Sequence, residues 1–94
     1  MNEAQARDEI CRLGKSLFDR GYVHATAGNI SVRLDDGFLI TPTAIGKRDT
    51  KAEGLAAVSL AGGPTGRQKP PSEVQLHVGA YRARAEVMAV IHAH

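Results

Sequence analysis

The chain has 94 residues, of which 43% are hydrophobic and 23% charged, and its formal net charge is +2. This length allows one small domain, and no basic run alternates with aromatic residues as in many nucleic-acid-binding proteins. Cys11 is the single cysteine, the N-terminus is too polar for a signal peptide, and no apolar stretch approaches the ~20 residues that cross a bilayer. We therefore expect a cytoplasmic protein without nucleic-acid or membrane partners.

The first predicted element is an amphipathic helix over residues 3–20, where apolar residues recur at helical spacing and Gly21 stands at the expected C-cap. Apolar and polar residues then alternate over residues 30–34, which predicts a half-buried strand. The acidic run that ends in glycine at 35–37 is typical of a hairpin turn. Residues 38–41 are its returning strand.

The middle of the chain gives weaker signals. Pro42 cannot donate to a strand ladder, so the returning strand ends there, and residues 46–54 are expected to form a loop. Residues 55–60 are either a strand or a helical turn, because so short a run does not show its period. A turn over 61–66 and an extended connector over 67–71 follow.

A second helix is predicted to begin at Ser72, which is a good N-cap, and Gln75 completes a capping box with it. The apolar run at 87–91 predicts a buried strand. The resulting order of helix, hairpin, probable strand, helix and strand indicates an α/β layered domain with a mixed or antiparallel sheet.

Two histidines close that last strand. His92 and His94 are two residues apart, so both side chains project from the same side of a strand and can reach one zinc-sized ion. A catalytic zinc usually takes three protein ligands, so a further ligand must come from elsewhere. We favour metal ligation over chance, because two polar rings at the end of an apolar run need a partner. His24 and His77 are expected to be structural or surface histidines.

A second set of polar residues suits an anion. Each member is ordinary turn or cap chemistry by itself, but backbone amides, an amide side chain, hydroxyls and a helix N-terminus together can hold a phosphate. The set consists of Gly28, Asn29, Thr43 and Ser72. Glu73 stands in the first turn of the second helix, where position alone favours a helix-dipole role over acid/base or metal chemistry.

Four ordered segments resemble the class II aldolase/adducin family, with the closest likeness to the zinc-dependent L-fuculose-1-phosphate aldolases. The segments are 26–31 (TAGNIS), 39–43 (LITPT), 71–73 (PSE) and 90–94 (VIHAH). The resemblance implies a three-layer α/β/α domain with a mostly antiparallel or mixed central sheet. In this comparison residues 1–94 are the N-terminal part of that domain. It also implies a homotetramer with active sites at subunit interfaces.

The resemblance further implies a function and roles for single residues. The expected activity is a zinc-dependent retro-aldol cleavage of a ketose phosphate, which gives dihydroxyacetone phosphate and an aldehyde. The zinc ion, or another divalent metal, would bind His92 and His94, with the family's third histidine beyond residue 94. The acid/base would be Glu73, and the phosphate pocket would include Gly28, Asn29, Thr43 and Ser72.

Related activities in the family are sugar-phosphate 4-epimerases, decarboxylases and dehydratases. Glu73 favours an aldolase or dehydratase, because the resemblance associates Asp with the epimerases and Lys with the decarboxylases at this position. A non-enzymatic adducin-like scaffold lacks the zinc site, and the two terminal histidines argue against it.

Ala44 and Pro71 stand where the family commonly has Gly and Ser, and both changes bear on the phosphate pocket. The chain alone is expected to be inactive and to hold no stoichiometric zinc.

Overall fold

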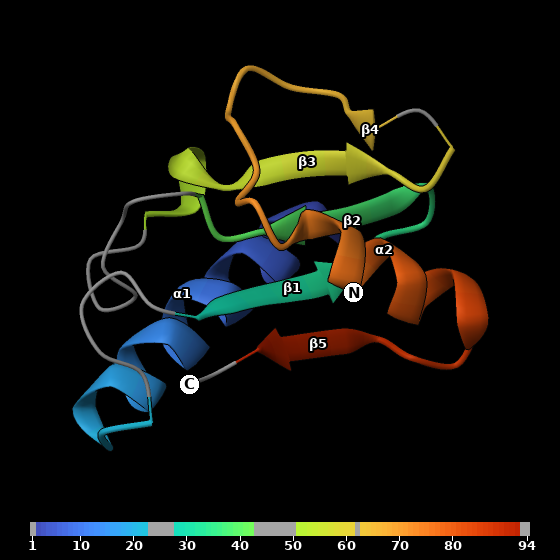
Figure 1. Cartoon of the computed structure of the whole chain (residues 1–94). Helices are drawn as coiled ribbons and strands as arrows, with labels where there is room; N and C mark the ends of the chain where they lie inside the picture. Colours follow the sequence, from blue (N-terminus) through green and yellow to red (C-terminus); the bar gives the residue numbers. More distant parts are fainter. Residues whose placement is uncertain (1, 23–27, 43–50, 62, 93–94) are drawn as a thin grey trace.

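The structure is a computed structural model that describes residues 2–22, 28–42, 51–61 and 63–92. Within these residues an antiparallel sheet in the order β4-β3-β2-β1-β5 lies between two helices (Figure 1). The strands are β1 (Asn29–Arg33), β2 (Gly37–Ile40), β3 (Ala56–Ser59), β4 (Gly63–Pro64) and β5 (Ala89–His92). The helices are α1 (Glu3–Asp19) and α2 (Val74–Ala83), with a 3-10 turn η2 at Ala52–Gly54.

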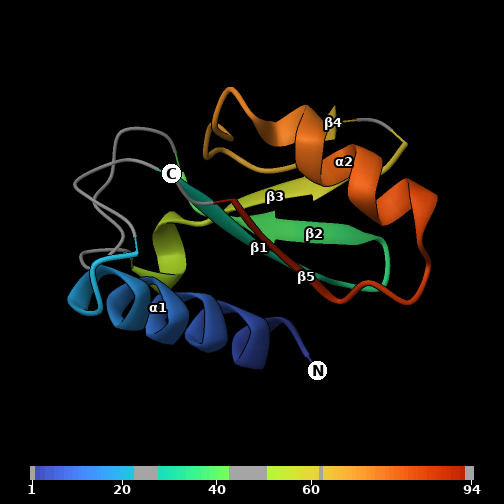
Figure 2. The ribbon, with the colours of Figure 1, turned by 60° about the horizontal axis from the view of Figure 1, so that its bottom comes forward.

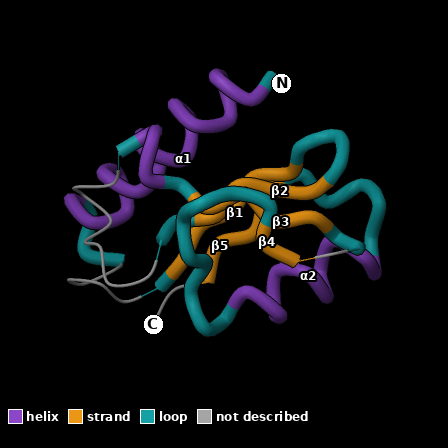
Figure 3. The backbone as a smooth tube through the Cα atoms, turned by 90° about the horizontal axis from the view of Figure 1, so that it is seen from above, coloured by secondary structure: helices purple, strands orange, loops and turns teal. Residues whose placement is uncertain are grey.

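The two helices cover opposite faces of the sheet, which gives the predicted three layers (Figures 2 and 3). On the α1 face, Ala6 and Ile10 pack with apolar residues of β1 and β2. On the α2 face, Val78 and Tyr81 pack with Phe38 and with residues of β2 and β3. Because both faces are covered, β1 is buried from its first residue to Val32, and the half-buried strand expected there was wrong in that respect.

Helix α1 matches its prediction closely and is capped at both ends. The Asn2 side chain accepts from the Gln5 backbone N–H, while the Gln5 side chain accepts from that of Asn2. This capping box was missed in the sequence. At the other end Gly21 has φ 81°, and Tyr22 N–H donates to the carbonyl of Leu17. Arg20 is the C-cap and the left-handed Gly21 follows it, so the helix has a Schellman-type end with its cap one residue before the predicted position.

The hairpin is confirmed, with Leu34 N–H donating to the Gly37 carbonyl at 2.7 Å. Gly37 itself is the first residue of β2, paired with Ser59 of β3. The ambiguous stretch at 55–60 is strand β3. Two short elements were missed in segments predicted to be irregular, since β4 lies in the predicted turn and η2 in the predicted loop.

The start of α2 differs from its prediction. Glu73 occupies the N-cap position, without a side-chain cap, and the helix runs from Val74. Ser72 Oγ instead donates to Glu73 Oε2 at 2.9 Å. The predicted capping box of Ser72 and Gln75 was therefore wrong, because the hydroxyl is bonded to the neighbouring carboxylate.

Strand β5 is an edge strand, paired on one side with β1. Its residues alternate between exposed and half-buried, and Ile91 is 48% exposed. The buried strand predicted from the apolar run was wrong because, in the described residues, its outer edge and its α1 face lack cover. Arg33 anchors the preceding connection, since its guanidinium donates to the carbonyls of Val87, Tyr81 and Arg84.

None of the helices in the described residues has the length and apolar character needed to cross a membrane.

Candidate active site

The candidate site is built around a buried polar row that joins β1 to α2. Asn29 and Ser31 are two residues apart on β1, so their side chains project from the same face of the sheet. His77 of α2 lies over both: its Nε2 contacts Asn29 Oδ1, and its Nδ1 lies 2.6 Å from Ser31 Oγ. Tyr81 continues the row one helical turn later, with its hydroxyl 2.7 Å from Ser31 Oγ.

Burial fixes the chemical state of His77. Its side chain is fully buried, and desolvation lowers its pKa from 6.5 to about 4. The nearby His92 lowers this pKa further, whereas the Glu73 carboxylate raises it. The ring is therefore neutral near pH 7. The expectation of a structural or surface histidine resolves to a structural one, because both ring nitrogens are engaged with β1.

His92 enters the same neighbourhood from β5. It is the direct partner of Asn29 in the strand ladder, and paired residues of an antiparallel sheet project from the same face. Because Asn29 contacts α2, His92 also lies on the α2 face of the sheet. Glu73 stands four residues before His77 at the start of α2, and His92 and the Glu73 carboxylate have opposite electrostatic effects on the pKa of this imidazole. Three elements, β1, β5 and the start of α2, thus contribute to one site.

The other predicted site residues are placed less fully. Gly28 precedes β1 with φ 79°, a conformation that suits glycine and turns the chain into the strand. Ser72 is exposed beside Glu73, and its hydroxyl bonds the carboxylate. Thr43 and His94 lie outside the described residues, as do His24 and Ala44. The predicted phosphate pocket is therefore represented in the structure by Gly28, Asn29 and Ser72.

The described residues supply part of the chemistry that a divalent metal requires. Among them, no three His, Cys, Asp or Glu side chains gather as a metal cluster. His92 is the member of the predicted histidine pair that the structure describes, and an imidazole with a carboxylate nearby suits zinc or a similar cation. The site therefore fits such an ion as the source of one imidazole ligand, with further ligands still required.

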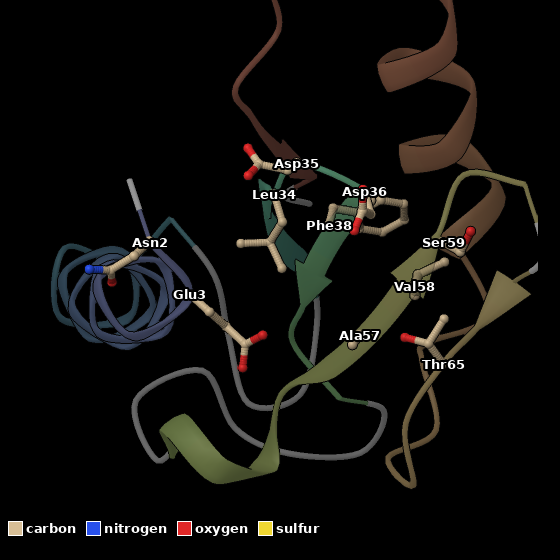
Figure 4. A pocket seen from close by; sticks show the side chains of 11 residues that line it. Asn2, Glu3, Leu34, Asp35, Asp36, Phe38, Ala57, Val58, Ser59 and Thr65 are labelled. Carbon is tan, nitrogen blue, oxygen red and sulfur yellow. The ribbon is translucent and has the colours of Figure 1, made fainter.

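A surface hollow lies near the other end of β1, away from Asn29. Its lining includes Glu3 of α1 and Asp35 and Asp36 of the β1–β2 turn, with Ser59 and Thr65 on the far side (Figure 4). Three carboxylates there would repel a phosphate. Asn29 opens β1 and Asp35 follows its end, so the strand places roughly 17 Å between Asn29 and these carboxylates. Phe38 lines the hollow and packs on Tyr81 with ring centroids 4.9 Å apart, so the hollow adjoins the Tyr81 end of the row and not the Asn29 end.

Sequence reasoning missed Ser31 and Tyr81 and gave His77 no position in the site. The signal was present in the spacing. His77 and Tyr81 are four residues apart and share a helix face, while Ser31 occupies a strand position two after Asn29. The spacing does not show that α2 packs on β1, and only the fold reveals this contact.

The lowered pKa of His77 predicts acid sensitivity in the metal-free protein. The unfolded chain takes up a proton on this ring below pH 6.5, whereas the folded protein does so only below about 4. Stability from this residue is therefore complete above pH 6.5 and is lost as the pH falls toward 4. The loss should reach about 2–3 kcal/mol. Urea unfolding of wild type and His77→Gln across this range checks it. Equal pH dependence in both proteins would contradict it.

Comparisons with known proteins test the expected family and fold. Residues 8–94 match the family model described as Class II Aldolase and Adducin N-terminal domain. The chain is 46% identical to a 3-oxo-tetronate 4-phosphate decarboxylase of Cupriavidus necator, over 98% of this chain and 42% of the relative. It is 37% identical to an L-fuculose phosphate aldolase of Haemophilus influenzae, over 100% of this chain and 44% of the relative.

The fold comparison gives the same result. The crystal structure of YgbL from Klebsiella pneumoniae superposes with a TM-score of 0.94 and 38% identity, covering 100% of this chain and 46% of that one. The chain spans less than half the length of the curated relatives described above. The predicted fold class is confirmed, and the chain belongs to the class II aldolase/adducin family.

Proposed function

We propose that the protein is a divalent-metal-dependent lyase that decarboxylates a phosphorylated 3-oxo sugar acid. The observation that carries the proposal is the identity of 46% and 44%, over nearly all of this chain, to two 3-oxo-tetronate 4-phosphate decarboxylases. The second candidate is the aldolase expected from the sequence. It is favoured by Glu73 at the start of α2, beside the His77 and His92 neighbourhood, and by 37% identity to an aldolase.

The two reactions share their central step. A four-carbon 3-oxo acid 4-phosphate that loses its carboxyl carbon keeps the bond electrons at carbon 2, next to the carbonyl. The fragment is the enediolate of dihydroxyacetone phosphate. Retro-aldol cleavage of a 1-phosphoketose leaves the same enediolate and releases an aldehyde in place of carbon dioxide. Either reaction ends when this carbon takes up a proton.

The residues of this chain would divide the work as follows. Asn29, with the Gly28 amide, would donate to the substrate phosphate, and Ser72 would fix the orientation of the Glu73 carboxylate. Glu73 would deliver the proton to the enediolate carbon. His92 would serve as a ligand for the divalent cation, whose chemical contribution when bound is to polarise the substrate carbonyl.

The proposal extends the family's other properties to this protein. Zinc as the preferred cation, a homotetramer with active sites at subunit interfaces and a cytoplasmic location are supported by the resemblance of the motifs. The sugar-phosphate relatives and the predicted phosphate-binding roles of Gly28 and Asn29 support a sugar phosphate as the small-molecule substrate.

A product assay distinguishes the two candidates. The purified enzyme is given a 3-oxo-tetronate 4-phosphate and, separately, L-fuculose 1-phosphate. Carbon dioxide and aldehyde are measured with and without prior chelation of metal. We expect carbon dioxide release with a kcat/KM at least about tenfold above that of aldehyde release, and loss of both activities on chelation. Faster aldehyde release would favour the aldolase, and full activity after exhaustive chelation would exclude a metal-dependent lyase.

A further inference from the structure

The row Asn29–His77–Ser31–Tyr81 is more than a buried contact between a strand and a helix. All four side chains are at most 2% exposed. Buried polar groups without partners destabilise a fold, so each of these must be bonded to another. In this row each buried polar group contacts the next one. The row ends at Asn29, the residue proposed to bind phosphate.

The row has a direction, because one of its atoms can only accept. Asn29 Oδ1 is a carbonyl oxygen, so His77 Nε2 must carry the proton and donate to it. This holds whether the ring is neutral or charged. In the neutral ring Nδ1 then accepts from the Ser31 hydroxyl, and Ser31 Oγ in turn accepts from the Tyr81 hydroxyl.

The direction determines which end of the Asn29 amide can serve a ligand. With Oδ1 accepting from His77 Nε2, the Nδ2 end of the amide with its two N–H donors points away from the ring. The reversed amide would require the other tautomer of His77, with the proton on Nδ1. An anion needs donors, so this is the productive orientation for a phosphate. The reversed amide would present an oxygen to the phosphate and repel it.

We propose that His77 is a positioning residue that orients the Asn29 amide so that its N–H donors face the substrate phosphate. The proposal rests on the phosphate-binding role of Asn29 in the proposed function. His77 makes no contact with the substrate in this scheme and acts only through Asn29.

Two substitutions at His77 separate positioning from a purely structural role. Asparagine places its amide at the distance of Nδ1 from the backbone and can keep the Ser31 contact while losing Asn29. Glutamine reaches the distance of Nε2 and can donate to Asn29 Oδ1 while losing Ser31. Each variant leaves one buried partner unsatisfied, so thermal melts should show a comparable loss of stability in both.

The measurements are made on the metal-loaded enzyme under conditions where thermal melts show every variant folded. We expect His77→Asn to raise KM for the phosphorylated substrate and Kd for inorganic phosphate about tenfold, with kcat within about threefold of wild type. His77→Gln should retain phosphate affinity within about threefold. In the background of Asn29→Ala, His77→Asn should add little further loss, because both changes remove the same contact.

The possible results test the positioning role of His77 separately from the proposed function. Equal loss of phosphate affinity in His77→Asn and His77→Gln would overturn the proposal, as would an additive effect of His77→Asn on Asn29→Ala. Inorganic phosphate binding is measured by calorimetry without turnover. Phosphate binding that follows the expected order without lyase activity would refute the proposed function alone. Lyase activity with phosphate binding indifferent to His77→Asn would refute the positioning role alone.

Discussion

Replacement of Glu73 by glutamine is expected to slow proton exchange at the hydroxymethyl carbon of dihydroxyacetone phosphate by about a thousandfold. General acid/base groups contribute roughly 10²–10⁴-fold, and the amide cannot carry the proton. The side chain stands at the start of α2, bonded to the Ser72 hydroxyl and close enough to His77 to affect its pKa. Exchange of solvent deuterium into the ketose, followed by NMR, is the measurement.

The metal content of Glu73→Gln should stay near that of wild type, because the isosteric amide leaves His92 in place. Glu9→Gln is the matched control, since Glu9 lies on α1, across the sheet, and pairs with Arg12 at the surface. It should leave exchange unchanged. Loss of metal from Glu73→Gln, or exchange at the wild-type rate, would remove Glu73 from the acid/base role.

This exchange experiment is informative for either candidate reaction. Decarboxylation and retro-aldol cleavage pass through the same enediolate, so both require protonation at the same carbon. The comparison with decarboxylases therefore changes the identity of the leaving fragment and leaves the expected effect of Glu73→Gln unchanged. It also runs against the expectation that Glu73 favours an aldolase or dehydratase over a decarboxylase, a question that the product assay decides.

Local patterns predicted those elements that depend on local physics. Helix α1 has helical periodicity and a glycine that permits a left-handed C-cap, and both features act within a few residues. The β1–β2 hairpin is equally local. The order of elements indicated a layered α/β domain, and the resemblance implied its three layers.

The wrong predictions concern features that depend on contacts between distant parts of the chain. The apolar run before His92 suggested a buried strand, yet β5 is at the sheet edge, and sequence alone does not give a strand its place in a sheet. Ser72 is a residue type that often caps helix N-termini, but its hydroxyl is bonded to Glu73. The alternating pattern implied that Ser31 faces solvent, but α2 covers that face of the sheet and Ser31 is buried.

The candidate site was predicted from motifs, and the roles given to its residues stay predictions. Asn29, Glu73 and His92 come from three separate elements, and the polar signals in the sequence could not show that these meet. In the structure His77 contacts Asn29, Asn29 pairs with His92 across the strand ladder, and Glu73 stands four residues before His77. His77 was set aside because a lone histidine on a helix is usually structural. It is structural, and its bonds to β1 are what connect it to the site.

Gly37→Ala is expected to lower the free energy of unfolding by about 3 kcal/mol or more. A Cβ on Gly37 would lie 2.0 Å from the Val58 carbonyl oxygen and 3.0 Å from its carbon, both backbone atoms of the adjacent strand. Such a contact cannot be relieved by rotating a side chain, so β2 and β3 must separate and weaken their ladder. Urea unfolding of the variant measures the loss.

Gly79→Ala is the matched control, because the same methyl group is added where nothing lies within 4 Å of it. Gly79 is an exposed residue inside α2, where alanine is favoured over glycine by about 0.5–1 kcal/mol. The two substitutions should therefore have opposite signs. A Gly37→Ala protein as stable as wild type would mean that β2 and β3 do not approach as closely as the structure shows. The assignment of Gly37 to the strand would then give way to the turn position that its sequence suggests.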